Sequence, residues 1–281
     1  MNSRAHTRDA YTPGATEGAY SLALGLATAL GDFTEAFVVI GGLVPSLICS
    51  RPDDDPDYEP HLGTLDVDIA FTRDLLDGKR YDEVVSRLRS IDLEPDPTPG
   101  RAPSHSRWRV RSRPELKVDF LLERGGDDEV VGRPKHLTAE FGPILIDGVH
   151  LAASSARDVV LAGTTHDGAM AERPVRVCSA GALSVLKAIA FRMRGFGKDA
   201  YDLAYVLAHA GLPMAAIAAP LRAYRDDPVV RRAVGVLETD FSTLDRLGPW
   251  RATRFLEADA PPEYAADVVA AVNGFVRALR A

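Results

Sequence analysis

Three acidic residues of this sequence have the type and spacing of a divalent-metal site. Asp66 and Asp68 lie two residues apart in LDVDIAF, and Asp119 lies in KVDFLL. Both segments alternate polar and apolar residues as strands do, so Asp66 and Asp68 are expected to share one face, and a neighbouring strand can bring Asp119 beside them. Carboxylates gathered in this way repel one another unless cations lie among them, and oxygen-rich sites favour Mg²⁺ or Mn²⁺.

A site of this kind suits nucleotidyl transfer. One metal activates the attacking hydroxyl while a second, roughly 3.5–4 Å away, neutralises the triphosphate and the leaving pyrophosphate. Gly41 and Gly42 end the apolar segment FVVIGG, where a turn without side chains lets the backbone approach phosphates, and a helix starting near Leu43 would direct its N-terminus at them. The alternative is a solvated strand face, but the order of glycine turn, DxD strand and third-acid strand favours the metal site.

Two cations further along the chain are candidate phosphate ligands. Lys187 and Arg194 are seven residues apart, so they lie on nearly the same face of an expected helix and can direct two positive charges toward a triphosphate. The alternative is that both are ordinary surface residues; the carboxylates favour phosphate contact for Lys187. Lys198 and Asp202, four residues apart, are expected to pair on the helix surface for about a few tenths of a kcal/mol.

Several segments together resemble a known family. VIGGLVPSL, HLGTLDVDIAF, KVDFLL and ALSVLKAIAFRMRGFGKDAYDLAYVL are similar to the nucleotidyltransferase toxins of the AbiEii and MenT kind, which belong to type IV toxin–antitoxin and phage-defence systems. The resemblance covers roughly residues 35–210 and implies a DNA polymerase-β-type nucleotidyltransferase fold. It implies that Asp199 and Asp202 belong to the active-site rim, where they would orient a lysine or the nucleotide, and that Lys198 binds the nucleotide with them. The long acidic insertion before the DxD strand departs from the family pattern and affects how an acceptor would approach.

The residues and the resemblance together predict an enzyme that transfers a nucleoside monophosphate from an NTP to an acceptor hydroxyl. Asp66 and Asp68 would hold the metals, Asp119 would ligate the catalytic metal and act as general base, and Lys187 would neutralise the triphosphate. The resemblance implies the 3′ end of tRNA as acceptor, toxicity as outcome and a cognate antitoxin as partner. The alternatives are an acceptor hydroxyl on a small molecule such as an aminoglycoside or on a protein, or a non-catalytic module that binds NTP or RNA.

An arginine-rich segment is a candidate acceptor-binding edge. Arg107, Arg109 and Arg111 alternate along it and Trp108 lies between the first two, which combines cations for phosphates with an aromatic ring for a stacked base. The alternative is a solvated strand face. His61, just before the DxD strand, either touches nucleotide or ion or is an incidental hydrogen-bonding partner.

The elements that must position these residues follow from the apolar patterning. Ser179 is a candidate N-cap, and Gly195 and Gly197 separate two helices. The proline-rich residues 94–104 are expected to form a surface connection. The expected strands are residues 37–42, 65–71, 108–112 and 116–123, with short β-like patches at 144–151 and 159–161; the expected helices are 17–30, 81–91, one beginning after residue 179, and 198–209. The fold class is therefore an α/β domain with a mixed sheet over residues 1–175, followed by an all-helical domain over 176–281.

The composition sets the remaining limits. The formal net charge of −7 over 281 residues argues against non-specific attachment to nucleic acid through bulk charge. Cys49 and Cys178 are too few for a disulfide framework and lack zinc-site spacing. The first residues have no apolar core of signal-peptide length, and no stretch approaches the roughly 18 apolar residues of a membrane span, so we expect a cytoplasmic protein with no membrane partner.

Overall fold

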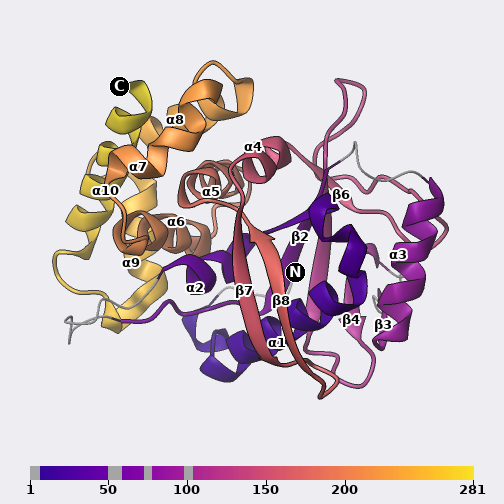
Figure 1. Cartoon of the computed structure of the whole chain (residues 1–281). Coiled ribbons are helices and arrows are strands. Elements are labelled where there is room, and N and C mark those ends of the chain that lie inside the picture. The colour runs from indigo at the N-terminus through magenta and orange to yellow at the C-terminus, as the bar shows by residue number, and fades with distance from the viewer. Residues whose placement is uncertain (1–6, 50–58, 73–77, 98–103) are drawn as a thin grey trace. The chain divides into compact units, whose positions relative to one another are not determined.

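The chain folds into two compact units, each built around its own core. The sheet unit comprises Pro13–Val44 and Gly63–Cys178, and the helical unit comprises Ser179–Ala281 with the described parts of Met1–Thr12 and Pro45–Leu62. The mixed sheet and the C-terminal helices expected from the sequence are confirmed (Figure 1). The computed structural model describes residues 7–49, 59–72, 78–97 and 104–281, so residues 50–58 of the acidic insertion lie outside the described residues.

The sheet unit contains one mixed sheet whose strands run in the order β3-β4-β5-β2-β1-β8-β7, with β6 paired to β5. β1 pairs antiparallel with β2, whereas β2 pairs parallel with β5. The strands are β1 (Phe37–Ile40), β2 (Asp66–Phe71), β3 (Leu93–Asp96), β4 (Ser104–Val110), β5 (Lys117–Glu123), β6 (Ile144–Ile146), β7 (Arg157–Thr164) and β8 (Met170–Val177).

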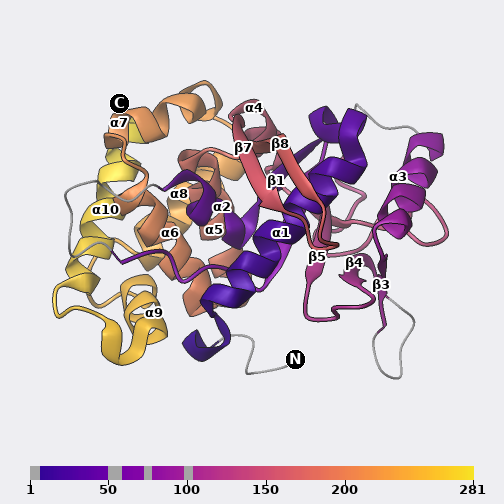
Figure 2. The ribbon, with the colours of Figure 1, turned by 60° about the horizontal axis from the view of Figure 1, so that its bottom comes forward.

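The apolar patterning explains why these segments lie inside the sheet. All four residues of β1 are buried, and along β5 every second side chain is buried. The helices α1 (Pro13–Leu30), α3 (Gly78–Ser90) and α4 (Val149–Ser154) complete this unit. α1 packs against β2, β7 and β8, and Figure 2 shows it beside β7 and β8. Its nine buried residues are all leucine, alanine or glycine, so the helix can lie close to the sheet.

Three expectations about this unit were wrong or incomplete. The first part of the proline-rich connection is strand β3, which tolerates Pro95 because it lies at the edge of the sheet, while residues 98–103 of that connection lie outside the described residues. β7 and β8 form a long antiparallel hairpin where only residues 159–161 were expected, because both strands are largely exposed and lack a regular apolar alternation. The patch expected over 144–151 is β6 followed by the helix α4.

The helical unit contains the helices that follow residue 179. Ser179 caps α5 as expected, since its hydroxyl accepts a hydrogen bond from the Ala182 N–H at 3.2 Å. α5 ends at Gly195, whose φ of +67° favours glycine, and α6 begins at Gly197. The helices are α5 (Ala180–Arg194), α6 (Gly197–His209), α7 (Met214–Ala218), α8 (Pro228–Asp240), α9 (Leu247–Leu256) and α10 (Tyr264–Arg280), and α2 (Val44–Ile48) lies where the chain passes from one unit to the other. Along the described residues, no helix is long and apolar enough to cross a bilayer.

α5 approaches α7 so closely that a glycine is required between them. A Cβ on Gly181 would lie 2.4 Å from the carbonyl oxygen of Ile217, a backbone atom that cannot rotate away. A Cβ on Gly235 in α8 would instead meet no heavy atom within 4 Å. These two helical glycines therefore separate the effect of packing from that of helix propensity.

We expect Gly181→Ala to lower the free energy of unfolding by about 1–3 kcal/mol, because the helices must move apart. The matched control Gly235→Ala is expected to raise it by up to about 1 kcal/mol, the gain in helix propensity. Urea denaturation followed by circular dichroism measures both. Equal effects of the two substitutions would contradict the close packing of α5 on α7.

Candidate functional site

The structure brings the three predicted carboxylates onto one face of the sheet. In the parallel pairing of β2 with β5, Asp68 lies directly opposite Asp119, and Asp66 pairs with Lys117 two residues earlier. Asp66, Asp68 and Asp119 all lie at the partly exposed positions of their strands, while Val67 and Val118 between them are buried. The prediction that a neighbouring strand brings Asp119 beside the DxD pair is confirmed. We call these three aspartates the carboxylate face.

Arg107 lies among these carboxylates. It faces Asp119 in the antiparallel pairing of β4 with β5, and its Nε donates a hydrogen bond to Asp119 Oδ1 at 2.6 Å. Its terminal nitrogen also donates to the second oxygen of Asp119 and to Asp66 Oδ2, the latter at 3.0 Å. The hydrogen bonds to Asp119 and the nearby negative charges raise the pKa of Arg107 above its ordinary value. Three carboxylates against one guanidinium leave this group of residues a formal charge of −2.

Asp119 differs from an ordinary surface carboxylate. Its side chain is 18% exposed, and burial raises its pKa above the usual range although Arg107 acts in the opposite direction. A raised pKa makes the carboxylate a stronger base. The group predicted to accept a proton therefore has an environment that favours proton binding.

Gly41 makes room for one of the carboxylates. Its φ is +76°, and a Cβ at this position would lie 1.8 Å from Asp68 Oδ2. The structural requirement for glycine here comes from Asp68, while the contact of Gly41 and Gly42 with phosphate stays a prediction. The helix expected near Leu43 begins at Val44 as α2 and has only five residues.

The donor atoms of the carboxylate face suit a hard divalent cation, but their described arrangement does not. Six carboxylate oxygens on one face match the oxygen preference of Mg²⁺ and Mn²⁺. Among the described residues, however, no group of three or more acidic, histidine or cysteine side chains is arranged to hold a metal ion. The guanidinium of Arg107 bridges Asp66 and Asp119. A cation bound by all three aspartates would therefore require Arg107 to release them.

The predicted acceptor-binding edge does not form. Trp108 is fully buried, so its ring has no exposed face on which a base could stack. Arg109 and Arg111 both pair with Glu94, at 2.9 and 3.2 Å, and Arg107 binds the carboxylate face. The sequence already indicated that Trp108 and the arginines would not form one surface. Side chains alternate along a strand, so Trp108 lies on the opposite side of β4 from Arg107 and Arg109.

The predicted lysine, arginine and aspartates of the helical unit form a buried charge cluster. Lys187 Nζ lies 3.1 Å from Asp199 Oδ1 and 2.6 Å from Asp202 Oδ2. Arg194 Nε donates to Asp199 at 2.7 Å, so Lys187 and Arg194 both bind the Asp199 carboxylate. Their spacing predicted that both would point toward one anionic group, and the group was expected to be a phosphate. The cluster consists of His61, Lys187, Arg194, Lys198, Asp199 and Asp202.

Apart from Arg194, whose side chain is 49% exposed, the residues of this cluster are buried or partly buried. Lys198 pairs with Asp202 as expected, but the expected surface location is wrong because the two residues are 7% and 0% exposed. Burial alone would raise the pKa of Asp202, yet Lys187 and Lys198 outweigh it and lower that pKa below the usual range. Burial would likewise lower the pKa of Lys187, but Asp202 and Asp199 raise it. Both groups are therefore charged, and removing Asp202 would take away the buried carboxylate that Lys187 and Lys198 both bind.

His61 is a hydrogen-bonding partner within this cluster. This is one of the two roles expected for it from the sequence, the other being contact with nucleotide or ion. Its Nε2 lies 2.8 Å from Asp202 Oδ1 and its Nδ1 lies 3.3 Å from the Ser46 hydroxyl. Because an ionised aspartate only accepts, Nε2 carries the proton and Ser46 donates to Nδ1. The ring stacks on Tyr201 with centroids 5.3 Å apart. Burial first, and then the charge of Lys198, lowers the pKa of His61 from 6.5 to about 4, so the imidazole is neutral at pH 7.

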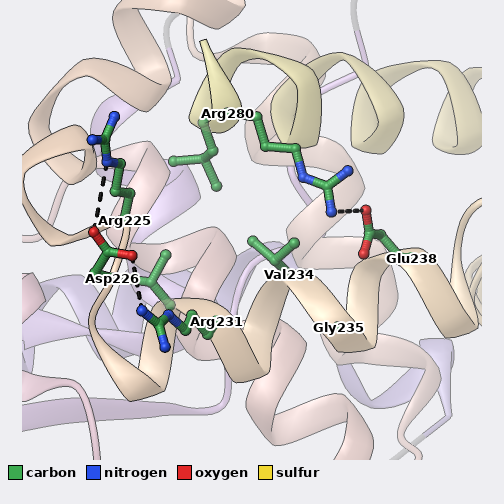
Figure 3. A pocket seen from close by; sticks show the side chains of 9 residues that line it. Arg225, Asp226, Arg231, Val234, Gly235, Glu238 and Arg280 are labelled. Carbon is green, nitrogen blue, oxygen red and sulfur yellow. Dashed lines mark hydrogen bonds and ion pairs between the residues drawn. The ribbon is translucent and has the colours of Figure 1, made fainter.

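A surface hollow of about 470 Å³ between α8 and α10 is a weaker candidate site (Figure 3). Arg231 and Arg225 both pair with Asp226, at 2.8 and 3.7 Å, and Arg280 pairs with Glu238 at 2.5 Å. Each lining arginine therefore already has a carboxylate partner. An anionic ligand would have to compete with these ion pairs.

Comparison with known proteins gives no assignment. No protein-family model matches the chain, and no curated protein sequence matches it significantly. The resemblance to nucleotidyltransferase toxins therefore remains an expectation that rests on the segments quoted above.

The neutral His61 makes stability depend on pH. Because its pKa is near 4 in the folded chain and 6.5 when unfolded, the unfolded state binds more protons between these values, and stability falls as pH drops from 6.5 to about 4. We expect a loss of about 3 kcal/mol over this window. His61→Gln, which keeps a donor for Asp202, should largely remove it, whereas a control substitution of the exposed His136 should not. Urea titrations at a series of pH values measure this, and an unchanged profile in His61→Gln would contradict the assignment.

Proposed function

We propose that this chain is a metal-dependent nucleotidyltransferase. The observation that carries the proposal is the pairing of Asp68 with Asp119 on adjacent parallel strands, with Asp66 on the same face. The oxygen atoms of these three aspartates are ligands of the kind that a hard divalent cation prefers. The segments that resemble nucleotidyltransferase toxins contain all three aspartates, which supports this chemistry over other uses of a carboxylate cluster.

In the proposed reaction, the oxygen of an acceptor hydroxyl attacks the α-phosphorus of an NTP. The bond to the bridging oxygen of the β-phosphate breaks, pyrophosphate leaves, and the hydroxyl proton passes to Asp119. Mg²⁺ or Mn²⁺ held by Asp66, Asp68 and Asp119 would activate the hydroxyl and neutralise phosphate charge. The raised pKa of Asp119 supports its role as base. Arg107 must release at least one oxygen of Asp119 before that oxygen can accept a proton.

Lys187 enters the proposal in a more limited way. In the described structure its charge is balanced by Asp199 and Asp202, so it is not an uncompensated cation awaiting phosphate. Its predicted contact with the triphosphate, and those of Arg194, Lys198, Asp199 and Asp202, rest on the resemblance. The buried charge cluster in itself supports a role for the two aspartates in orienting the lysine.

For the acceptor we propose the 3′ end of tRNA, with toxicity restrained by an antitoxin in a cytoplasmic toxin–antitoxin or phage-defence system. This part rests on the resemblance, because Arg109, Arg111 and Lys117 are paired with acids of β3 and offer no basic groove beside the carboxylates. A small molecule or a protein hydroxyl is the alternative acceptor.

One observation favours a second candidate function, a non-catalytic module that binds NTP or RNA. Arg107 occupies two of the three carboxylates, as a permanent counter-ion would in a protein that needs no metal there. The two functions differ in whether a cation can displace the arginine and whether label from an NTP is transferred.

The transfer reaction is tested with the full chain, each α-labelled NTP, Mg²⁺ and total tRNA, resolved on a denaturing gel. We expect label on tRNA with the parent protein and loss of transfer by at least about a hundredfold in Asp68→Asn, since a neutral amide is a poor ligand for a hard cation. The control Asp158→Asn removes an exposed carboxylate of β7 and should leave transfer unchanged. Parallel reactions contain an aminoglycoside or the protein alone. Absence of transfer to every acceptor would favour the non-catalytic module.

Competition between Arg107 and a cation is tested by Mn²⁺ binding, measured from the electron paramagnetic resonance signal of the free ion. Arg107→Gln should bind Mn²⁺ more tightly, on the order of tenfold, because the ion no longer has to displace a charged hydrogen bond. Arg109→Gln is the matched control, since Arg109 lies two residues away on the same strand face and pairs with Glu94. Equal affinities of Arg107→Gln and the parent protein would show that the arginine and the ion do not compete.

A further inference from the structure

The exposed face of α9 combines an aromatic ring with cations. Trp250 is 50% exposed, and the guanidinium carbons of Arg251 and Arg254 lie 5.2 and 5.8 Å from its ring centroid. Arg246 precedes the helix and is also exposed. The opposite face of α9 packs through Ala252 and other buried residues against α6 and α10. The arginines and Trp250 are thus presented outward by a helix that is held on its other side. We call Arg246, Trp250, Arg251 and Arg254 the α9 platform.

These arginines differ in their partners from the arginines of β4 and from those of the hollow in Figure 3. On β4 and in the hollow of Figure 3 the arginines lie within ion-pair distance of carboxylates. No described carboxylate lies within that distance of Arg246, Arg251 or Arg254. Arg251 and Arg254 make cation–π contacts with Trp250, and Arg246 interacts electrostatically with the carboxylate of Asp245, the residue before it. Arg251 and Arg254 therefore retain their positive charges for a ligand, in a chain whose formal net charge is −7.

A hollow lies directly beside the ring. It has a volume of about 410 Å³ and is lined by Trp250, Thr253, Arg254 and Glu257. This volume falls within the range of about 300–1,000 Å³ typical of small-ligand sites, so one nucleotide can enter. The Glu257 carboxylate and the Thr253 hydroxyl supply acceptors for an exocyclic amino group, while Arg254 supplies donors.

We propose that the α9 platform binds single-stranded nucleic acid, with an unpaired base stacked on Trp250 and phosphates held by Arg246, Arg251 and Arg254. Indole and guanidinium planes stack on bases without regard to sequence, and arginines neutralise the backbone. A duplex would not serve, because its bases are stacked on one another and unavailable to the ring. The proposal does not rest on nucleotidyl transfer, since binding at this helix requires neither NTP nor metal.

The test is fluorescence anisotropy of a labelled 12-nucleotide oligouridine titrated with the full chain in EDTA. Trp250→Ala should weaken binding about tenfold or more, and Trp250→Phe should retain most of it, because stacking is worth about 1–3 kcal/mol per base. Arg251→Gln/Arg254→Gln should reduce the slope of log K against log salt concentration by about 1.4. The matched control Arg225→Gln/Arg231→Gln removes the same charge from arginines that already pair with Asp226.

A second readout uses the two tryptophans of the chain. Trp108 is fully buried, so the quenchable, red-shifted emission belongs to Trp250 and should fall when oligouridine binds. Circular dichroism confirms that the variants are folded. The proposal is overturned if oligouridine does not bind, if Trp250→Ala binds as tightly as the parent, if the control weakens binding equally, or if a duplex competes as well as the single strand. Displacement of the RNA by polyglutamate with no effect of Trp250→Ala would instead indicate a surface for acidic protein.

Discussion

Like charges on neighbouring strands repel one another and must be compensated by opposite charges. This requirement accounts for the ion pairs along the four adjacent strands β2, β5, β4 and β3. The parallel pairing of β2 with β5 places Asp68 beside Asp119 and Asp66 close by. Arg107 compensates two of these carboxylates from β4. The acids of β3 in turn compensate the remaining cations of β4 and β5, since Glu94 binds Arg109 and Asp96 binds Lys117. The edge strand with its proline and acids is thus a source of counter-charges rather than a simple surface connection.

The helical unit meets the same requirement under much stronger burial. Asp202 is fully buried and remains ionised because Lys187 and Lys198 surround it. Desolvation of such a group is expensive, and two cations with one neutral histidine donor supply the compensating interactions. His61 contributes a hydrogen bond without adding a further charge, because burial and the charge of Lys198 lower its pKa and keep the imidazole neutral. His61 therefore binds α6 through its hydrogen bond to Asp202 as well as through aromatic stacking on Tyr201.

Compensation also determines which residues remain available for ligands. An arginine held by a carboxylate must exchange one partner for another, so its net gain on binding an anion is small. By that measure the arginines of β4 are poor candidates for phosphate contact, and those of α9 are better ones. Counting cations along a sequence does not separate the two cases, because both segments combine arginines with a tryptophan. The difference lies in the acids that the fold brings within reach.

The sequence by itself determined the mixed α/β class, the DxD strand and the strand of Asp119, the N-cap at Ser179 and the glycine break between α5 and α6, because these depend on local periodicity and backbone preference. It did not determine the edge strand β3, the exposed hairpin β7–β8 or the partners of Arg107 and His61. Those depend on which strands become neighbours and on the register between them, and for His61 on a contact with Asp202 across 141 residues. Residue type and spacing therefore identified the charged groups, while only the tertiary structure decided which of them neutralise one another.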